Sequence, residues 1–406
     1  MKLPRMQCTK ILYFCRMEGN FKMMAKTFYG FEEILAKELR NLGAMNVKAG
    51  VRGVTFEGDT GFMYKANLSL RTALKVLKQL KSFPVNDVND LYRKIYQIDW
   101  SRHFSVDHTF AISFTGRSQG IDNTVFAAQK IKDGIVDRFR DDHGKRPSVN
   151  TREPDFHFVV HVQKGRCFVS LDSSGSSLHH RGYRTATNIA PINEVLAAGI
   201  LLLSGWDGQS DFLDPMCGSG TFLVEAAMIA CNIPVNINRK GFAFEKWPDF
   251  DADLYEKILD SCWKKTREFH HKIIGYDKAP SAVEKSIDNV VNANLDDYIA
   301  VRRQDFFQSE KPVDGPLHMV FNPPYGERLN IQMEKFYARL GETLKHGYPG
   351  SKVWFITSNL PAIKHVGLRP SRKIKLFNGK LESRLLHFEM YAGSKKAKKQ
   401  SHGTQD

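Results

Sequence analysis

The sequence predicts an α/β protein in which small α+β modules precede a mostly parallel, doubly wound sheet. Short apolar segments with strand character alternate with helical segments throughout the second half, as in parallel sheets that helices cover on both faces. Hairpin patterns interrupt this alternation in the first half, which favours small modules over one long parallel sheet. The last apolar segments, in "KIKLFNGKLESRLLHFEMYAG", form a hairpin pattern around an Asn-Gly turn.

The first half alternates between strand and helix patterns. "GFEEILAKELRNLG" predicts a helix because Phe31, Ile34, Leu35 and Leu39 recur at helical spacing and a glycine ends the run. The Lys-Gly pair in "FHFVVHVQKGRCFVSLDSSG" predicts a hairpin turn. The expected elements are, in order, a strand at 24–31, a helix at 30–43, a strand pair at 47–59, a helix at 60–80, a strand at 108–116, a helix at 123–142 and a hairpin at 156–175.

The second half begins after a polar segment at 173–188, which we interpret as a joint between domains. A buried helix is expected from about Pro191 in "APINEVLAAGILLLSGW". Apolar strands then alternate with helices before the closing hairpin. These strands are expected at 211–214, 273–277, 300–305, 319–324 and 352–358.

The chain is basic, with 59 Lys and Arg against 44 Asp and Glu and a formal net charge of +15. Residues 1–23 contribute +4 and the residues from Ser394 onward contribute +3, so +8 remains on the body. A basic surplus favours polyanionic partners, most simply nucleic acid, because neutralising phosphates releases counterions. Charge alone leaves open a basic protein without such a partner.

The six cysteines are scattered and have no CxxC spacing, so neither a zinc site nor a disulfide framework is indicated. No apolar run approaches the ~20 residues of a membrane span. The N-terminal apolar core "ILYFC" is too short for a signal peptide, and no cleavage site follows it. We therefore expect a cytoplasmic protein with no membrane association and no metal. Met17 and Met23 are alternative translation starts.

Four polar side chains follow successive predicted strands of the second half: Asp214, Asp277, Asp305 and Asn322. Ligands of an open parallel sheet bind at the carboxyl ends of its strands, so we expect these side chains to share one site. Turn capping explains a single acid at a strand end, but it does not explain four polar residues in register.

The segment "DPMCGSG" places a glycine loop between the first of these strands and a helix. Gly218 and Gly220 allow close backbone approach to a ligand. No lysine follows the glycines and residue 223 is leucine, so the loop matches neither a P-loop nor a dinucleotide fingerprint. S-adenosylmethionine, a cation with a carboxylate and an adenosine end, fits better. The expected partners are its amino and sulfonium region for Asp214, its ribose for Asp277 and its adenine for Asp305.

The segment "VFNPPYGERL" places an amide and two prolines directly after an apolar strand. An exocyclic amine on a base or an amide is a poor nucleophile because its lone pair is delocalised. The carbonyls of the Asn322 side chain and the Pro323 backbone can accept its two hydrogens, and Pro324 stiffens the turn. Tyr325 offers a face on which a planar substrate can stack. The pattern predicts methyl transfer to a planar amine without a metal.

These motifs closely resemble those of the THUMP-domain RNA methyltransferases, in particular the members that methylate guanine N2 in bacterial 23S ribosomal RNA. The resemblance rests on "LDPMCGSGT", "NPPYGERL" and "LHHRGYR…APINEVLAA", and it runs from about Ala25 to Glu389. It implies a Rossmann-like class I methyltransferase domain, whose parallel sheet ends in an antiparallel hairpin. The implied organisation is an N-terminal extension at 1–23, a ferredoxin-like region at 24–75, a THUMP RNA-binding domain at 76–178, a methyltransferase domain at 179–393 and a basic tail at 394–406.

The resemblance also implies a reaction, in which a methyl group passes from S-adenosylmethionine to N2 of a flipped guanine in 23S ribosomal RNA. Some relatives carry a second, fused methyltransferase, and we expect its activity to be absent here. The implied cofactor residues are Asp214, Pro215, Cys217, Gly218, Gly220, Asp277 and Asp305, and the implied target-base residues are Asn322, Pro323, Pro324 and Tyr325.

Three side chains near the joint, and one beside the target-base motif, are weaker candidates for RNA contacts. They are Arg181, Tyr183, Arg184 and Arg328. A solvated basic linker explains the first three equally well, and a structural ion pair explains Arg328.

Rival functions remain open at this point. A transfer-RNA guanine-N2 methyltransferase would share both motifs, and a protein glutamine or DNA adenine methyltransferase would share the second. From a different class, a non-catalytic RNA-binding factor in ribosome assembly would tolerate Asn322→Ala. The sequence is silent on the modified nucleotide and on oligomeric state.

Overall fold

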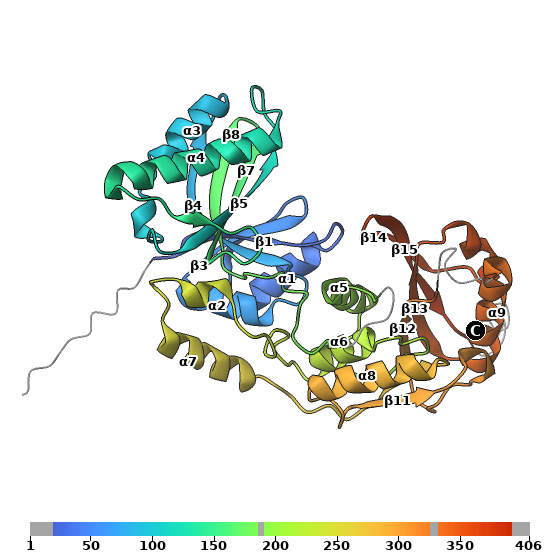
Figure 1. Cartoon of the computed structure of the whole chain (residues 1–406). Helices are drawn as coiled ribbons and strands as arrows, with labels where there is room; N and C mark the ends of the chain where they lie inside the picture. The colour runs from blue at the N-terminus through green and yellow to red at the C-terminus, as the bar shows by residue number, and fades with distance from the viewer. Residues whose placement is uncertain (1–18, 186–190, 325–331, 392–406) are drawn as a thin grey trace, which may run out of the picture.

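The computed structural model describes residues 19–185, 191–324 and 332–391, which form two sheets with helices packed against them (Figure 1). The basic tail lies outside these residues, and only 19–23 of the expected N-terminal extension is described. Strand β1 begins at Phe21, so the boundary that we expected at residue 23 falls inside a strand. The reason is that Met23 is buried in the core of the first sheet.

The N-terminal sheet has eight strands in the order β2-β3-β1-β4-β8-β7-β5-β6. Neighbouring strands are antiparallel, except that β5 runs parallel to β6 and to β7. The strands are β1 (Phe21–Lys26), β2 (Met45–Ala49), β3 (Gly53–Gly58), β4 (Lys75–Pro84), β5 (Thr109–Gly116), β6 (Ser148–Val149), β7 (Phe156–Gln163) and β8 (Arg166–Asp172).

The helices of this half pack against the sheet in one continuous core. Their ends follow local chemistry: α1 stops where Gly43 turns to φ +101°, and the Asn123 side chain accepts hydrogen bonds from the first N–H groups of α4. The helices are α1 (Glu32–Leu42), α2 (Thr60–Ser69), α3 (Val88–Tyr96), α4 (Thr124–His143) and the short η1 (Trp100–Arg102).

The ferredoxin-like and THUMP modules, expected at 24–75 and 76–178, share this sheet. Strand β4 pairs with β1 on one side and with β8 on the other, so it joins the two modules. The first half is therefore built on one continuous sheet.

The helix that we expected at 60–80 is wrong in its second half. Helix α2 ends at Ser69, and strand β4 begins at Lys75. Val76 and Leu77 are adjacent and both buried, as in a central strand covered on two faces. The tertiary pairing of β4 overrides a local apolar pattern that suits a helix equally well. Helix α3 was not predicted.

The C-terminal half contains a seven-stranded sheet in the order β11-β10-β9-β12-β13-β15-β14. Strands β9 to β13 are parallel, and the β14–β15 hairpin adds antiparallel strands at one edge. This confirms the predicted doubly wound sheet with its closing hairpin. The strands are β9 (Asp211–Asp214), β10 (Ile273–Asp277), β11 (Ile299–Arg303), β12 (Leu317–Phe321), β13 (Ser351–Thr357), β14 (Arg372–Asn378) and β15 (Leu381–Glu389).

Two separate apolar cores lie on this sheet, one containing residues of α5 and α6 and the other residues of α9. Helix α5 begins at Glu194, three residues after the expected Pro191, because the Asn193 side chain caps its first N–H groups. The helices are α5 (Glu194–Ser204), α6 (Thr221–Ala230), α8 (Pro280–Asn292) and α9 (Met333–Gly347), with the short η3 (Phe306–Gln308) and η4 (Pro361–Val366).

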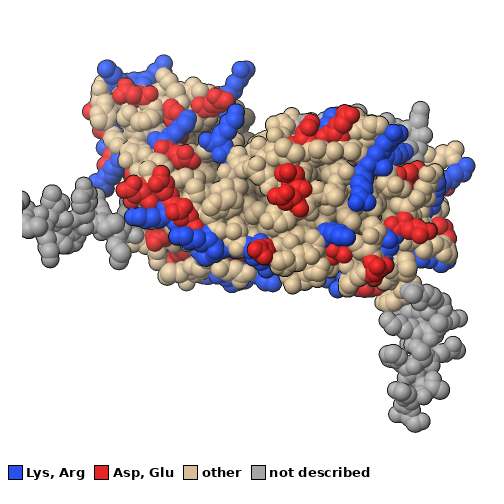
Figure 2. Space-filling model, turned by 90° about the horizontal axis from the view of Figure 1, so that it is seen from below, with Lys and Arg blue, Asp and Glu red and all other residues tan. Residues whose placement is uncertain are grey.

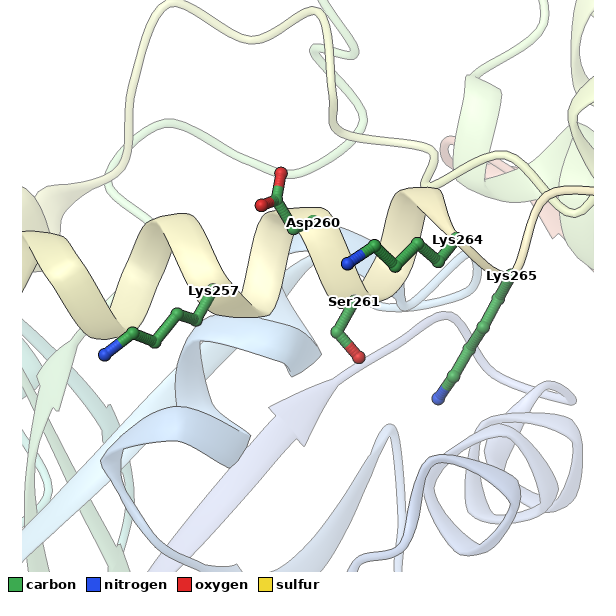
Figure 3. A pocket seen from close by; sticks show the side chains of 5 residues that line it. All are labelled: Lys257, Asp260, Ser261, Lys264 and Lys265. Atoms are coloured by element: carbon green, nitrogen blue, oxygen red, sulfur yellow. The ribbon is translucent and has the colours of Figure 1, made fainter.

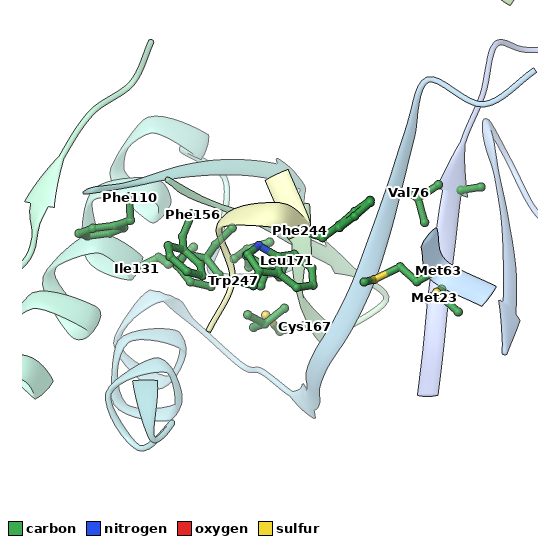
Figure 4. Close-up of a cluster of buried hydrophobic side chains, with 14 of the residues drawn as sticks. Met23, Met63, Val76, Phe110, Ile131, Phe156, Cys167, Leu171, Phe244 and Trp247 are labelled. Atoms are coloured by element: carbon green, nitrogen blue, oxygen red, sulfur yellow. The ribbon is translucent and has the colours of Figure 1, made fainter. Parts of the chain in front are cut away.

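An insertion between α6 and β10 connects the two halves. It contains η2 (Ala243–Lys246) and α7 (Ala252–Trp263), and α7 packs beside α2. Phe244 and Trp247 of the insertion lie in the N-terminal core (Figure 4), where the Phe244 ring stacks on Tyr64 with centroids 4.5 Å apart. In return, Phe31 belongs to the core of the C-terminal half, against Gly199 of α5. The halves are therefore packed together through apolar side chains.

Candidate functional site

The carboxyl ends of four parallel strands bring the predicted site residues to one edge of the seven-stranded sheet. Asp214 ends β9 and Asp277 ends β10. Asp305 follows β11 by two residues, and Asn322 directly follows β12. Strands β10, β9 and β12 are neighbours in the sheet and β11 lies beside β10. Sheet topology therefore collects these side chains although nearly a hundred residues separate the first from the third.

The glycine loop crosses from β9 toward β10 and is fixed there by backbone hydrogen bonds. The Cys217 N–H donates to the Tyr276 carbonyl over 2.8 Å. The Gly218 N–H donates to Asp277 Oδ2 over 3.1 Å. Asp277 Oδ1 accepts from the Ala279 N–H over 2.9 Å. Asp277 thus holds the loop and the start of the next turn together, a contact that the sequence analysis did not foresee.

Gly220 occupies a position that excludes any side chain. Its φ is +79°, and a Cβ there would lie 2.5 Å from Ser286 Oγ. Gly220 precedes α6, whose first N–H groups receive no capping side chain. Such N–H groups and the positive end of the helix dipole favour a negatively charged ligand group. The glycine therefore lets the loop pack against α8, and the uncapped N–H groups at the start of α6 remain open to a ligand.

Asp214 is a buried carboxyl group that accepts a hydrogen bond from the backbone of its own loop. It is 1% exposed, and its Oδ1 accepts from the Met216 N–H over 3.0 Å. Burial raises the pKa of Asp214 well above its usual range, and the charge of Asp277 raises it further. Within the described ranges no Lys, Arg or His forms an ion pair with it. A cationic ligand would favour the ionised form, because an opposite charge offsets desolvation.

Two further residues assigned to the cofactor are packed into the loop. Pro215 and Cys217 are both buried. Burial raises the pKa of the Cys217 thiol, and its Sγ lies 3.9 Å from Ser286 Oγ. The thiol is therefore a small packed group and not an activated nucleophile.

The region after β11 is ordered by Asp305 itself. Asp305 Oδ1 accepts from the Phe307 N–H over 3.0 Å and so begins η3. The Gln304 N–H donates to the Asp277 carbonyl over 3.0 Å. These bonds keep Asp305 beside the end of β10, where the sequence analysis expected an adenine contact.

Asn322 carries the most informative polar atom of the site. Its Oδ1 is buried and has no hydrogen-bond partner in the part of the chain that the structure describes. A buried acceptor without a partner costs roughly 1–3 kcal/mol. Pro323 is buried behind it, and Pro324 is half-buried. Tyr325 and Arg328 lie outside the described residues.

Of the three RNA-contact candidates near the joint, two are buried and Arg184 is half-buried. Arg181 is 1% exposed and pairs with Glu225 of α6 over 3.2 Å. Tyr183 is fully buried in the core of the C-terminal half. Arg184 is 14% exposed at its side chain and pairs with Glu194. The pattern of basic and aromatic residues resembles an RNA-binding segment, but the burial of Arg181 and Tyr183 contradicts an RNA contact for these two residues, and Arg184 has interior partners.

Helix α8 contributes residues that the sequence analysis missed. Asn289 Nδ2 donates to the Ser219 carbonyl of the glycine loop over 3.0 Å, and Asn289 Oδ1 accepts from the Thr185 N–H over 3.1 Å. Ser286, one turn earlier, faces Gly220. Both are fully buried polar residues three positions apart on one helix face. This polar interruption of a buried helix face was the available sequence signal.

A shallow hollow of about 400 Å³ lies on the outer side of α7 (Figure 3) and contains none of the strand-end residues. Its lining is Lys257, Asp260, Ser261, Lys264 and Lys265.

Within the described ranges, no three His, Cys, Asp or Glu side chains gather as metal ligands do. No helix of the described segments is long and apolar enough to cross a bilayer.

Comparison with known families gives three consecutive matches along the chain. Residues 22–77 match the RlmL ferredoxin-like domain, residues 85–172 the THUMP domain, and residues 181–387 the RMKL-like methyltransferase domain. The last match alone covers half of the chain. The order of the three agrees with the order expected from the sequence.

Two curated relatives illustrate the similarity. The ribosomal RNA large subunit methyltransferase K/L of Cellvibrio japonicus is 38% identical over 382 residues, which cover 89% of this chain and 50% of that protein. A Synechocystis protein, provisionally named RNA methyltransferase slr0064, is 36% identical over 366 residues, covering 89% of this chain and 95% of that protein. The chain thus spans about half the length of the K/L relative.

A solved structure supports the same fold. The provisionally named methyltransferase SMU.472, crystallised with S-adenosylhomocysteine (SAH), superposes with a TM-score of 0.82 at 29% identity. The superposition covers 93% of this chain and all of that chain. The likeness extends over both sheets, since neither alone spans that share of the chain.

Proposed function

Because this chain belongs to the S-adenosylmethionine-dependent methyltransferase family with ferredoxin-like, THUMP and RMKL-like domains, we propose that it methylates the exocyclic N2 of a guanine in 23S ribosomal RNA. The observation that carries the chemistry is the buried Oδ1 of Asn322 at the carboxyl end of β12, which has no hydrogen-bond partner among the described residues. An acceptor kept dry and without a partner is suited to bind the hydrogen of an incoming amine.

The described residues fit S-adenosylmethionine. Gly218 and Gly220 carry no side chain that would cover the loop backbone. The buried Asp214 carboxyl group has no cationic partner in the described part of the chain. The cofactor supplies a methyl group on a positively charged sulfur. The residues proposed to hold it are Asp214, Pro215, Cys217, Gly218, Gly220, Asp277 and Asp305.

The target amine would be bound through its two hydrogens. Asn322 Oδ1 accepts one, and the Pro323 carbonyl accepts the other. Accepting both hydrogens reduces delocalisation of the nitrogen lone pair into the ring and orients it for transfer. The proton leaves the methylated amine afterwards, so no side chain needs an unusual pKa. Stacking on Tyr325 completes the proposed pocket, with the base flipped out at a cost of a few kcal/mol.

The RNA part of the proposal rests on the family and on the relatives' names. The THUMP match supports RNA binding by the N-terminal half. The K/L relatives are named for large-subunit ribosomal RNA, which supports 23S RNA as the substrate. Figure 2 shows acidic and basic side chains interspersed on the face seen from below, so no single basic stripe marks an RNA path there. A cytoplasmic location remains part of the proposal.

The test is methyl transfer to 23S RNA isolated from cells that lack the modification, followed by nucleoside mass spectrometry. The expected product is N2-methylguanosine. Asn322→Ala is expected to lower kcat about 10²–10³-fold, the usual effect of removing one preorganised polar contact to the reacting group. Asn322→Asp keeps an acceptor oxygen and should retain part of the activity. SAH binding by calorimetry serves as the control that each variant keeps the cofactor site.

The other outcomes identify the rivals. N6-methyladenosine would keep the chemistry and reject guanine. Product on transfer RNA, with none on 23S RNA, would indicate the transfer-RNA enzyme. Wild-type RNA binding without any methyl transfer, unchanged in Asn322→Ala, would indicate a non-catalytic assembly factor.

A further inference from the structure

We propose that Arg184 is a positioning residue that fixes the spacing between the start of α5 and the glycine loop, and so sets the affinity for the cofactor. The inference rests on the proposed cofactor site. It replaces the expectation that Arg184 contacts RNA, and it assigns this arginine a role in the reaction through residues that it holds.

Arg184 bridges two helix starts. Its Nη2 donates to Thr221 Oγ1 over 2.7 Å and to the Ile192 carbonyl over 3.1 Å. Its Nε lies 3.1 Å from Glu194 Oε1, an ion pair without the geometry of a hydrogen bond. Thr221 is the first residue of α6, directly after Gly220, and Glu194 is the first residue of α5. One guanidinium therefore sets the distance between the two elements.

The planar fork of arginine suits this role better than a lysine would. A guanidinium directs several N–H groups in fixed directions, whereas an ammonium is a point charge on a flexible stem. The Arg184 side chain is 14% exposed, so water competes weakly for these contacts. Replacing Arg184 with Lys or with Gln should therefore move Thr221 away from its present position.

A second attachment reaches the loop from α8. The Thr185 N–H donates to Asn289 Oδ1, and Asn289 Nδ2 donates to the Ser219 carbonyl. Adjacent residues of the joint thus hold the glycine loop from two sides. Arg184 holds it at Thr221, and Thr185 holds it at Ser219 through Asn289. A loop held on both sides is preorganised, which lowers the cost of ordering it when a ligand binds.

The charge of Arg184 also acts on a buried carboxyl group. Glu194 is 3% exposed, burial raises its pKa to about 7, and Arg184 opposes this rise. Loss of the arginine would leave Glu194 buried without its cation, and the carboxyl group would then hold its proton at neutral pH. The design of a test must separate this effect from the contact with Thr221.

The experiment measures SAH binding by calorimetry, and the KM for S-adenosylmethionine and for RNA separately. The variants are Arg184→Gln and the double variant Arg184→Gln with Glu194→Gln, in which no unpaired carboxyl group remains. Both are expected to bind SAH about tenfold more weakly, as for loss of a charge-assisted hydrogen bond at a preorganised site. The KM for S-adenosylmethionine should rise as SAH binding weakens. The KM for RNA and kcat at saturating substrates should stay within about twofold of the wild-type values.

Asn292→Ala is the matched control. Asn292 Nδ2 donates to Thr185 Oγ1 over 2.8 Å, so the substitution removes a side-chain contact of the same joint. The Thr185 N–H keeps its hydrogen bond to Asn289, and Thr221, Ser219 and Glu194 are untouched. Asn292→Ala should therefore leave SAH binding unchanged, which would show that losing any one side-chain contact of the joint does not explain the weaker binding.

Two results would overturn the role of Arg184. One is SAH binding unchanged in both variants. The other is a raised KM for RNA with an unaltered KM for S-adenosylmethionine, which would restore the RNA-contact reading. If wild-type protein bound no SAH, the proposed cofactor site itself would be wrong and the positioning role would fail with it. The calorimetry needs no RNA, so it separates these results from an error in the proposed substrate.

Discussion

Gly220 is the residue at which a single added carbon should damage the cofactor loop. A Cβ would lie 2.5 Å from Ser286 Oγ, in a backbone conformation of φ +79° that costs an L residue roughly 1–2 kcal/mol. We expect Gly220→Ala to weaken SAH binding at least tenfold, as the loop moves to relieve the clash. Calorimetry of SAH binding is the measurement.

The chain offers a matched control for the strain. Gly205 has the same φ of +79°, but no atom lies within 4 Å of a Cβ there. Gly205→Ala should therefore cost stability without changing SAH binding. Adding Ser286→Ala to Gly220→Ala removes the closest atom and should restore part of the affinity. Equal effects of Gly205→Ala and Gly220→Ala on binding would contradict the clash.

The strand-end residues were predictable because their identity and their position in the sequence pattern agree. An acid or an amide after each apolar strand needs only the rule for parallel sheets to be placed at one edge. Arg181 and Tyr183 were mispredicted because a sequence does not show which side of a basic segment faces the interior. Arg181 is buried against Glu225, which is distant in the sequence and becomes its neighbour only in the fold, and Tyr183 is buried in the core that contains α5.

At the scale of elements, residues 181–185 of the joint connect the two halves of the structure. Arg181 donates through Nη2 to the Arg71 carbonyl of the N-terminal half and pairs with Glu225 of α6. Gly182, at φ +101°, passes so close to Asn238 that a Cβ would overlap its carbonyl oxygen at 1.9 Å. Arg181 thus contacts both halves, whereas Tyr183 lies in the core of the C-terminal one, and Arg184 and Thr185 form hydrogen bonds with it.

Arg181→Met is expected to destabilise the protein by roughly 3–5 kcal/mol, because it leaves the Glu225 carboxylate buried without its cation. Both side chains of the pair are 0% exposed. Urea unfolding followed by circular dichroism measures the loss. The double variant with Glu225→Leu should recover a large part of it, since an apolar pair replaces the ions.

The exposed Arg138–Asp142 pair on α4 provides the comparison. The Arg138 and Asp142 side chains are 31% and 30% exposed. Arg138→Met should therefore cost less than about 1 kcal/mol of stability. A loss of similar size at Arg181 would mean that the buried pair has no structural role.

Elements with a strong period were predictable, and the misplaced helix shows where prediction ends. The α4 pattern and the β7–β8 hairpin follow from local spacing and from a Lys-Gly turn with positive φ at both residues. The residues of β4 have an apolar pattern compatible with a helix, and only pairing with β1 and β8 makes them a strand. The pairing with β1 sets Met23 opposite Lys78, and the pairing with β8 sets Leu77 opposite Asp172, so both partners are distant in the sequence.

At the scale of the molecule, the two halves share their cores. Phe244 and Trp247 come from the C-terminal, catalytic half but lie among the apolar residues of the N-terminal half, and Phe31 lies in the catalytic core. Deleting residues 1–180 would expose the first two rings and remove the third. Such a deletion would therefore test folding as much as it tests RNA binding.

The shared core predicts that the halves unfold together and that a ligand of one half stabilises both. SAH would contact only the catalytic half, yet it should slow hydrogen exchange in the β5 and β7 peptides as well as in β12 and β13 near the unfolding midpoint in urea.

Phe244 is fully buried, and Phe244→Ala should cost roughly 3–5 kcal/mol. It should also confine the SAH effect to the β12 and β13 peptides. Phe355→Ala, which empties a fully buried position in the other core of the catalytic sheet, should destabilise to a similar extent and leave the effect in both halves. Protection limited to β12 and β13 in the wild-type protein would show that the halves are thermodynamically independent, in which case the THUMP half would reach its RNA without a fixed position relative to Asn322.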